Sequence, residues 1–392
     1  SGTLSLGAND RLADGATVTV AGGILDTTGS NRTDTVSIFN MSSGSLNGGG
    51  TITAGTYDLS GGTVTGNLGA GTLNSSGAVF LNGTSDAGTV NVTAGTLTLG
   101  SANRLSDSAA VTVSGGALAI GGNNDAVGTV VLSGGSITGT GGTLTGSSYD
   151  MRSGLVSAIL GGSAIALTKT TAGAVTLTGT NTYTGNTSVS GGTLVINGDQ
   201  TAATGNVSVT GTLAGTGTVG GSTTINSGGH LAVGDGTAGS TGTETFKQNL
   251  TFVSGSIFDW DLNATNNVVD PGSAPNQGSY DKVVASGTAG TMTGTSIFNV
   301  VLGTNGFADA FWDSTKTWSN IFTGSGATGA NLTAIFSTFS GTNVNSDGSV
   351  TGQGQFTFNG GTTLTWSAVP ETSTAFAGLL IGAGLLRRRR KN

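Results

Sequence analysis

The chain of 392 residues contains no cysteine, three prolines, one histidine and only 8% charged residues. Without cysteine, disulfide bonds and thiolate chemistry are excluded. With a single histidine, His230, a serine–histidine triad would depend on that residue alone. Little charge and 73 glycines would fit a disordered chain, but disordered chains lack regular apolar spacing, and this sequence has such spacing almost throughout.

Charge is divided unevenly along the chain. Residues 1–370 hold eight Lys/Arg and nineteen Asp/Glu, a net charge of −11, and the remaining cations form one terminal cluster: Arg387, Arg388, Arg389, Arg390 and Lys391. A body this acidic repels nucleic acid, so no nucleic-acid partner is expected. The chain starts without methionine or an apolar leader. Any secretion signal is therefore expected to have been removed or to lie outside this sequence.

Residues 1–235 alternate apolar and polar positions in short runs separated by glycine. In one run Val111 and Val113 lie two apart, as do Leu118 and Ile120 in the next. Period two is the signature of β-strands. Glycine pairs recur at intervals of roughly twenty residues, which indicates a repeat architecture. A longer repeat of about 93 residues is also visible, since "TYDLSGG" at 56–62 returns as "SYDMRSG" at 148–154.

These periods predict a right-handed parallel β-helix of coils about twenty residues long. One coil alone would not be stable: ordering each residue costs about 1–2 kcal/mol, and five small apolar side chains return only about 1.5–3 kcal/mol each. Stacked coils pair their backbones and share one continuous interior. A β-sandwich is the alternative, but it needs hairpin turns at much shorter spacing.

The segment "KTTAGAVTLTGTNTYTGNTSVSGGTLVING" at 169–198 resembles the autotransporter-associated β-strand repeat family, and 81–99 carries a degenerate copy. The resemblance extends over residues 1 to about 235. It implies an exported β-helical stalk and implies no chemistry.

Residues 236–367 form a second, aromatic-rich module. All four tryptophans and eleven of the fourteen phenylalanines lie in it. In "SIFDWDL", Phe258, Trp260 and Leu262 share one strand face. We expect a β-rich unit that completes the solenoid or packs across its end as a cap, because an open end exposes strand edges. Residues 307–322 are the best candidate for a short helix, with Asp313 or Ser314 as its N-cap.

Residues 368–392 form a third unit with an uncharged apolar run at 375–386. As a helix, these twelve residues span about 18 Å, which is short against a hydrocarbon core of about 30 Å. The terminal cations would remain cytoplasmic and halt export. A weak span with a strong stop fits temporary insertion in the inner membrane. A plain C-terminal membrane anchor is the alternative.

The tail resembles the PEP-CTERM sorting signal, which combines a Pro-Glu-Pro-type motif, an apolar helix and an arginine-rich end. The motif here is Val369, Pro370 and Glu371, followed by Thr372 where the family usually has proline. The resemblance implies processing by an exosortase, a membrane-embedded protease/transpeptidase of Gram-negative-type bacteria that make exopolysaccharide.

Four aspartates are the candidates for a metal or glycan site: Asp259, Asp261, Asp270 and Asp281. Asp259 and Asp261 would lie roughly 6–7 Å apart on one strand face, near the carboxyl separation of glycosidases. A solvated strand face explains the same pattern. Calcium is the cofactor that oxygen-rich loops would suit, but the spacing matches no calcium motif, so no cofactor and no catalytic residue are predicted. His230 is expected in a solvent-exposed turn.

The sequence therefore predicts a non-enzymatic, exported solenoid of the cell envelope, cell surface or extracellular matrix. Its partners would be an exosortase and exopolysaccharide or envelope glycans, which its Thr, Asn and Ser side chains would bind weakly at many places. A polysaccharide-degrading β-helix enzyme is the second hypothesis. An autotransporter passenger is the third, disfavoured because no membrane β-strands follow the repeats.

Overall fold

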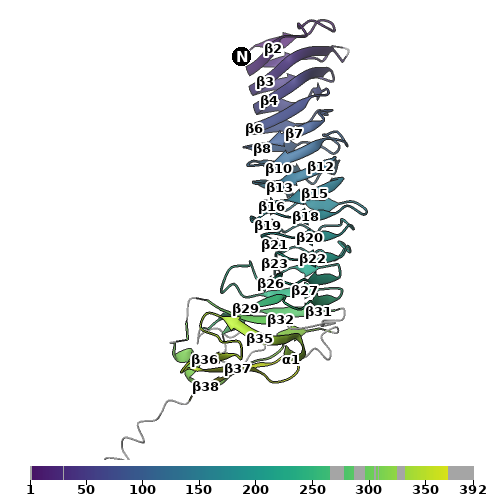
Figure 1. The fold of residues 1–392 in the computed structure, drawn as a ribbon. Helices are drawn as coiled ribbons and strands as arrows, with labels where there is room; N and C mark the ends of the chain where they lie inside the picture. The colour runs from purple at the N-terminus through teal and green to yellow at the C-terminus, as the bar shows by residue number, and fades with distance from the viewer. Residues whose placement is uncertain are drawn as a thin grey trace, which may run out of the picture.

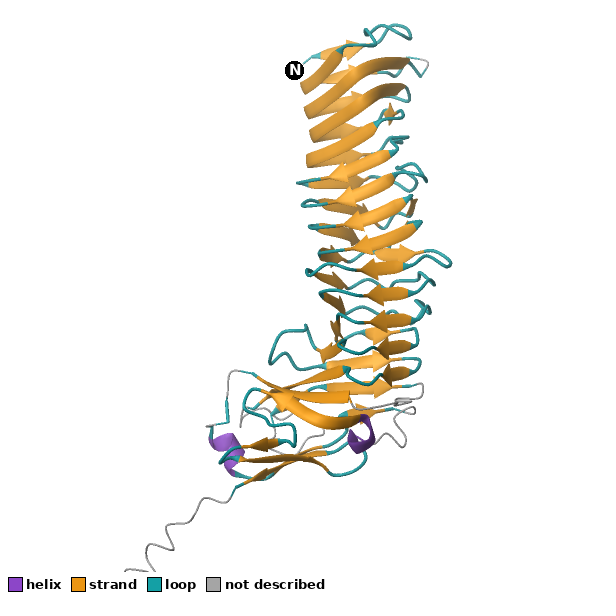
Figure 2. Cartoon of the chain, viewed as in Figure 1, coloured by secondary structure: helices purple, strands orange, loops and turns teal. Residues whose placement is uncertain are grey.

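A computed structural model describes residues 2–29, 31–264, 278–286, 296–303, 306–307, 309–324 and 332–369. The chain forms a long rod that ends in a compact unit near its C-terminus (Figure 1). The rod is a parallel β-solenoid of about 12 turns with almost no helix, which confirms the predicted all-β solenoid class. Strands dominate every level of the rod, and loops connect them at its edges (Figure 2).

Most coils contribute one strand to each of two parallel ladders, A and B. The strands of ladder A are β7 (Thr89–Val92), β9 (Ala110–Val113), β12 (Thr129–Leu132), β15 (Ser148–Met151), β18 (Leu167–Lys169), β20 (Thr187–Val189), β22 (Val207–Val209), β25 (Thr223–Ile225) and β28 (Leu250–Phe252). The strands of ladder B are β8 (Thr96–Leu99), β10 (Ala117–Gly121), β13 (Ser136–Gly139), β16 (Gly154–Val156), β19 (Ala174–Leu177), β21 (Thr193–Ile196), β23 (Thr212–Gly215), β26 (His230–Val233), β29 (Ile257–Asn263), β32 (Ser296–Leu302) and β35 (Phe336–Gly341).

The first coils use long strands that run through both ladders, and some later coils add a short third strand. The long strands are β2 (Thr17–Asp26), β3 (Thr33–Asn47), β4 (Thr51–Val64) and β6 (Thr72–Leu81), with β1 (Thr3–Ser5) paired to the end of β2. The additional short parallel strands are β5 (Asn67–Leu68), β11 (Asp125–Ala126), β14 (Thr143–Thr145), β17 (Ile159–Gly161), β24 (Thr218–Val219), β27 (Thr243–Phe246), β31 (Lys282–Ala285) and β34 (Phe322–Thr323).

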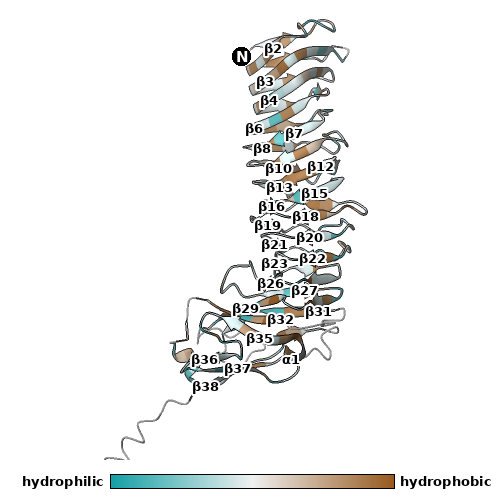
Figure 3. Ribbon diagram, in the orientation of Figure 1, coloured by the Kyte–Doolittle hydropathy of each residue, from teal (hydrophilic) through white to brown (hydrophobic). Residues whose placement is uncertain are grey.

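The strand register gives the length of a coil. Val111 pairs with Val130 and Val130 with Tyr149, so these coils take 19 residues each, close to the predicted twenty. Inward positions of ladder B, such as Leu118 and Ile137, are fully buried and stack on one another, and so do Val111 and Val130 of ladder A. Hydrophobic and polar residues alternate along the strands (Figure 3). The alternation read from the sequence therefore separates the interior of the rod from its surface.

The 93-residue repeat is visible as a repeated side-chain contact. The Tyr57 hydroxyl donates to the carbonyls of Ile52 and Gly69 at 3.0 Å each. The Tyr149 hydroxyl donates to the carbonyls of Leu144 and Gly161 at 2.8 and 2.6 Å. All three residues of the second set lie 92 positions after those of the first, so the two copies of the long repeat share side-chain contacts as well as sequence.

Glycines turn the corner between ladders A and B because no side chain fits there. Gly135 has a φ of +72°, and a Cβ built on it would lie 2.1 Å from the carbonyl oxygen of Gly116 in the preceding coil. A Cβ built on Gly154 would lie 2.5 Å from the carbonyl oxygen of Gly135, and one built on Gly192 would lie 2.4 Å from that of Gly173. Both the backbone conformation and the close approach of coils therefore require glycine.

Parallel pairing continues from the repeats into the C-terminal module. β26 pairs with β29, β29 with β32 and β32 with β35, so this module extends ladder B. The strands that differ are β30 (Ser279–Tyr280), antiparallel to β29, and a four-stranded antiparallel sheet of β33 (Lys316–Trp318), β36 (Ser349–Val350), β37 (Gly354–Phe358) and β38 (Leu364–Ala368). The module thus extends the rod and also supplies a cap sheet.

Aromatic rings fill the space between the last coils and the cap sheet. Trp260, Trp312, Trp318 and Trp366 are all buried. Trp260 and Trp318 meet at a centroid distance of 5.3 Å, and Phe339 of β35 stacks on Phe358 of β37 at 4.5 Å. These contacts join the cap to the solenoid end. In "SIFDWDL" the alternation of Phe258, Trp260 and Leu262 toward the core is as predicted.

The helix predicted within 307–322 is shorter than expected and begins before the predicted N-caps, Asp313 and Ser314. A 3-10 helix covers Ala310–Asp313, and its N-cap is Asp309, which accepts a 2.9 Å hydrogen bond from Phe311 N. Asp313 is therefore the last helical residue and Ser314 the C-cap, so the predicted N-caps were wrong. The following residues form β33 because Lys316 and Trp318 alternate inward. The other described helix is α1 (Leu332–Ile335).

The apolar helix predicted at 375–386 lies outside the described residues. Within the described part of the chain, no helix has the length and apolar character needed to span a bilayer.

Replacing Gly135 by alanine should destabilise the rod through its corner. Positive φ and overpacking together should lower the free energy of unfolding by about 2–4 kcal/mol, as measured by urea denaturation. Gly88→Ala is the matched control, because Gly88 has no strained φ and no atom within 4 Å of a built Cβ. It should change stability by less than about 0.5–1 kcal/mol. If both substitutions lower the free energy of unfolding by the same amount, the requirement for glycine at the corner is wrong.

Candidate functional site

One outward-facing position of ladder B runs in register along the rod from the fourth long strand to the cap. We call this series the outer column, and its members in order are Ala78, Thr96, Ala117, Ser136, Leu155, Thr176, Val195, Ala214, Ala232, Asp259, Asn299 and Ser340. The column changes character along its length: mostly small or hydroxyl side chains come first, interrupted by the exposed Leu155, then apolar ones, then a polar group at the C-terminal end.

The polar end of the column is a continuous hydrogen-bonded ladder across coils. His230 Nδ1 lies 2.6 Å from Asp259 Oδ2, and Asn299 Nδ2 donates to Asp259 Oδ1 at 2.6 Å. Ser340 Oγ then donates to Asn299 Oδ1 at 2.9 Å. The hydrogen bond to Asp259 raises the pKa of His230, and partial burial opposes this by less. Asp259 is thus held by both neighbouring coils.

His230 does not lie in a turn as predicted. It is the first residue of β26, its side chain is 35% exposed, and it pairs with Asp259 in the next coil. The physical reason is the strand register, which places Thr212, His230 and Ile257 side by side on the outer face. Sequence spacing alone does not show this proximity, because 29 residues separate the two members of the ion pair.

The apolar part of the column is covered by a loop. We call residues 234–242, between β26 and β27, the flap. Val195, Ala214 and Ala232 are buried as a small cluster of their own on the outer face. Gly236 of the flap lies over Ala214, since a Cβ built on it would be 3.2 Å from the Ala214 methyl carbon. The flap therefore closes an apolar patch that the coils alone would leave exposed.

Two buried carboxyl groups fasten the flap. Gly239 N donates to Asp261 Oδ1, and Gly242 N donates to Asp281 Oδ1 at 2.9 Å. Asp281 Oδ2 also accepts from Asp261 N at 2.9 Å. Burial raises the pKa of Asp261 to about 7 and that of Asp281 well above its ordinary value. Asp261 is only 2% exposed, so the solvated strand face expected for it is wrong.

Glu244 is a third buried carboxyl near Asp281. It points inward from β27, is fully buried, and neither of its carboxyl oxygens has a hydrogen-bond partner in the structure. Burial raises its pKa well above the ordinary value of 4.5. A protonated, neutral side chain is the form that this site favours.

The structure brings three of the four predicted aspartates into one region, but their carboxyls are already engaged. Asp259 binds His230 and Asn299, while Asp261 and Asp281 hold the flap. Within the described ranges, no group of three or more His, Asp or Glu side chains is arranged to hold a metal ion. Asp270 lies outside the described residues. Calcium binding, which was considered but not predicted from the sequence, is not tested by these contacts.

The sorting residues fall at or beyond the end of the described chain. Val369 is exposed, and its backbone N–H donates to the Gln353 carbonyl at 2.8 Å. Pro370 and Glu371 lie outside the described residues, as does the terminal cluster of Arg387, Arg388, Arg389, Arg390 and Lys391.

Several charged residues that were not singled out from the sequence are buried, and two of them, Lys169 and Glu244, are fully buried. Lys169 is fully buried on the inner face of β18, and its ammonium donates to the carbonyls of Thr171 and Gly191. Burial lowers its pKa. Glu244 is the other. The signal was present in both cases, because Lys169 follows Leu167 and Glu244 precedes Phe246 at the inward spacing of two.

Two adjoining hollows open where the cap meets the last coils. One, of about 490 Å³, lies between the flap at Ala238, β32 at Asn299 and the turn at Thr342. The other, of about 560 Å³, extends toward Thr351 and Gln353. They share Gly306, Phe307 and Asn343, and we call the pair the cap groove.

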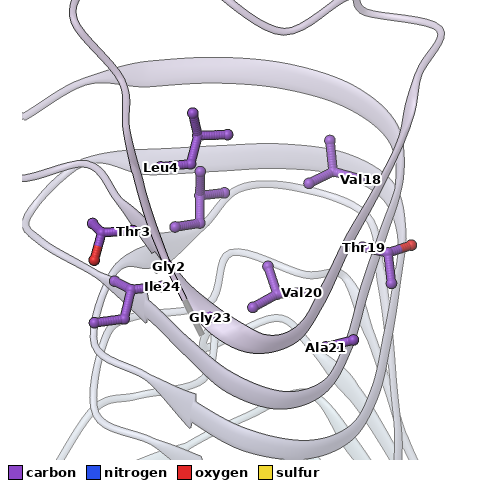
Figure 4. A pocket seen from close by; sticks show the side chains of 10 residues that line it. Gly2, Thr3, Leu4, Val18, Thr19, Val20, Ala21, Gly23 and Ile24 are labelled. Atoms are coloured by element: carbon purple, nitrogen blue, oxygen red, sulfur yellow. The ribbon is translucent and has the colours of Figure 1, made fainter.

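A third hollow, of about 390 Å³, lies at the first coil. Leu4, Val18 and Val20 surround the space there, with Ile24 at its edge (Figure 4). Leu4 is 57% exposed and Ile24 36% exposed. This hollow is apolar and offers no titratable side chain.

The β-solenoid fold, together with a repeat match, fits a passenger-type or surface β-helix protein. Residues 167–196 match the family model described as Passenger-associated-transport-repeat. The match overlaps the copy at 169–198 and confirms the repeat resemblance for that segment. No curated protein and no solved structure matches the chain.

The buried carboxyls should make the protein more stable in acid than at neutral pH. A raised folded-state pKa gives stability that is fully present below the ordinary pKa and is lost as the pH rises through the folded value. For Asp261 that interval runs from 3.8 to about 7. The free energy of unfolding in urea should fall by up to about 1.4 kcal/mol per pH unit for each titrating carboxyl.

Glu244→Gln should flatten the decline of stability with rising pH, because it removes a carboxyl group whose ionisation is opposed by burial in the folded state. The variant should have a higher free energy of unfolding than the wild type at pH 8 and the same value at pH 4. Asp14→Asn, at an exposed position, is the control and should leave the slope unchanged. A Glu244→Gln variant with the wild-type slope would show that the buried carboxyl does not titrate with unfolding.

Proposed function

We propose that this chain is a structural and adhesive solenoid of the cell surface or extracellular matrix that associates with exopolysaccharide. The observation that carries the proposal is the unbroken outer column. It presents hydroxyl side chains at Thr96, Ser136 and Thr176 on every second coil, with Ala117 and Leu155 on the coils between them. Neighbouring coils lie about 4.8 Å apart, so equivalent groups recur along the rod. Many weak contacts to one polymer would then add through avidity.

The rod has further polar series that favour the same function. Asn74 Nδ2 donates to Asp58 at 2.8 Å, and Asn91 Nδ2 donates to Asn74 at 2.9 Å. Such amide ladders fix the side chains in place, so less conformational entropy is lost when a ligand binds. The repeat match at 167–196 supports export of this kind of stalk.

Sorting by an exosortase, with transient inner-membrane insertion, is the second element of the proposal. Its support is the sequence pattern Val369-Pro370-Glu371, the apolar run and the terminal cations. The cap sheet ends at Ala368, and the motif begins at the next residue. A protease acting near the motif would therefore leave the described fold intact.

Cleavage of polysaccharide is the alternative that one observation favours. Asp261, with a pKa raised to about 7, lies two residues from Asp259 on the same strand, and the general acid of a glycosidase is a carboxyl group with a raised pKa. Against it, Asp261 is covered by the flap. Adhesion without chemistry therefore remains the preferred function.

A binding experiment with polymer of graded length separates these functions. The full-length protein should co-sediment with high-molecular-weight exopolysaccharide, and retention should fall by about 10²-fold or more as the polymer is shortened to oligosaccharides, because avidity is lost. No reducing ends should be released. If the wild type releases reducing ends and an Asp259→Asn/Asp261→Asn variant does not, the protein is a polysaccharide-cleaving enzyme and the adhesive function is wrong.

Processing of the tail can be tested by intact-mass measurement on protein from its native host. We expect the mature chain to end near Pro370–Glu371, without the terminal arginines. Replacing Pro370 and Glu371 by alanine should leave the tail attached. Recovery of wild-type protein that retains Arg387 to Lys391 would contradict sorting and favour a plain membrane anchor.

A further inference from the structure

The cap groove is a built feature of the rod's C-terminal end. Its floor includes Asn299, whose amide is fixed on both sides by Asp259 and Ser340. Phe307 lines both hollows and is held against Trp312 and Trp366 at centroid distances of 4.7 and 5.6 Å. The groove therefore has a rigid polar side and an apolar, aromatic bed.

Several polar side chains at the groove have unused hydrogen-bonding capacity. Thr342, Asn343 and Thr351 are exposed and Gln353 is half-buried. None of these four side chains forms a hydrogen bond with another described residue. Asn343 has a φ of +64°, a conformation that asparagine tolerates better than most residues. Free amides and hydroxyls beside an apolar bed match a sugar ring, which carries hydroxyl groups at its edge and C–H groups on its faces.

The groove is electrically neutral in a protein that is otherwise acidic. None of the described residues that line it is charged, whereas residues 1–370 carry a net charge of −11. Anionic polymers would be repelled by this field and would find no cation in the groove. An extended peptide would be expected to use a free strand edge and side-chain pockets.

We propose that the cap groove is a binding site for a short stretch of neutral polysaccharide, with Asn343, Thr351 and Gln353 as the hydrogen-bonding residues. This inference rests on the proposed association with exopolysaccharide and deepens it. The groove selects uncharged sugars at one end of the rod, and the outer column adds weak contacts along its length.

Short oligosaccharides isolate the groove, because they are too small for avidity along the rod. Calorimetric titration of the full chain with neutral gluco- and galacto-hexasaccharides should show saturable binding to one site. Asn343→Gly, which keeps the backbone conformation available, combined with Gln353→Ala should weaken that binding about tenfold or more. Gln248→Ala, an exposed amide outside the groove, should leave it unchanged. Unaltered thermal melting of all variants shows that the fold is kept.

The outcomes separate the groove from the general function. If polymer binds but the groove variants retain wild-type affinity for the hexasaccharides, the groove assignment is wrong and the adhesive function stands. If neither polymer nor hexasaccharide binds, both proposals fail. Preference for uronate oligomers over neutral ones overturns the choice of a neutral ligand. Groove-dependent binding of an extended peptide instead of sugar assigns the groove to a protein partner and overturns the proposal.

Discussion

The close stacking of one coil on the next is the constraint on which the rest of the structure depends. At the corner between the two ladders, the backbones approach so closely that a methyl group at Gly135 would lie 2.1 Å from the carbonyl of Gly116. Glycine is therefore required by contact between coils as well as by the turn itself. The same approach lets each strand hydrogen-bond to two neighbours, which supplies the stability that an isolated coil lacks.

Once the coils are in register, a single outward position becomes a line of side chains along the rod. Its properties change where the sequence changes: hydroxyls lie at Thr96 and Thr176, an apolar patch lies under the flap, and Asp259 and Asn299 follow. His230, two residues before the column position of its own strand, bonds to Asp259. The scaffold is uniform, and local function arises from which residues occupy the line. The cap groove lies where this line meets the aromatic end module, so the binding site proposed for a neutral polysaccharide coincides with the end of the repeat.

The sequence predicted the rod well because its signal is local and repeated. Period-two alternation identified inward residues such as Leu118 and Ile137, and the recurrence of glycine pairs gave the coil length. The aromatic face of Phe258 and Trp260 followed from the same rule. In each case the neighbour on the adjacent coil presents the same pattern, so local preference and long-range contact agree.

The site was predicted less well because it depends on contacts between non-equivalent coils. Alternation places Asp261 at an outward position, yet the flap buries it. No local sequence pattern predicts that the loop after β26 folds back over the strand. His230 lies at a coil edge in sequence but meets Asp259 through register. The inward positions of Glu244 and Lys169 could have been predicted, since strict alternation places both side chains inside the rod. Ionisable residues are rarely buried, so they were not expected there.

The most direct test of coil stacking uses the absence of cysteine. Pairs of single cysteines can be labelled with nitroxides at outer-column positions, and the spin–spin distance measured by pulsed electron paramagnetic resonance. Thr96 and Thr176 are four coils apart, which predicts about 19 Å at 4.8 Å per coil, and Ala78 with Thr176 should add about 4.8 Å. Distances that do not increase with the number of coils between the labels would contradict the stacked rod.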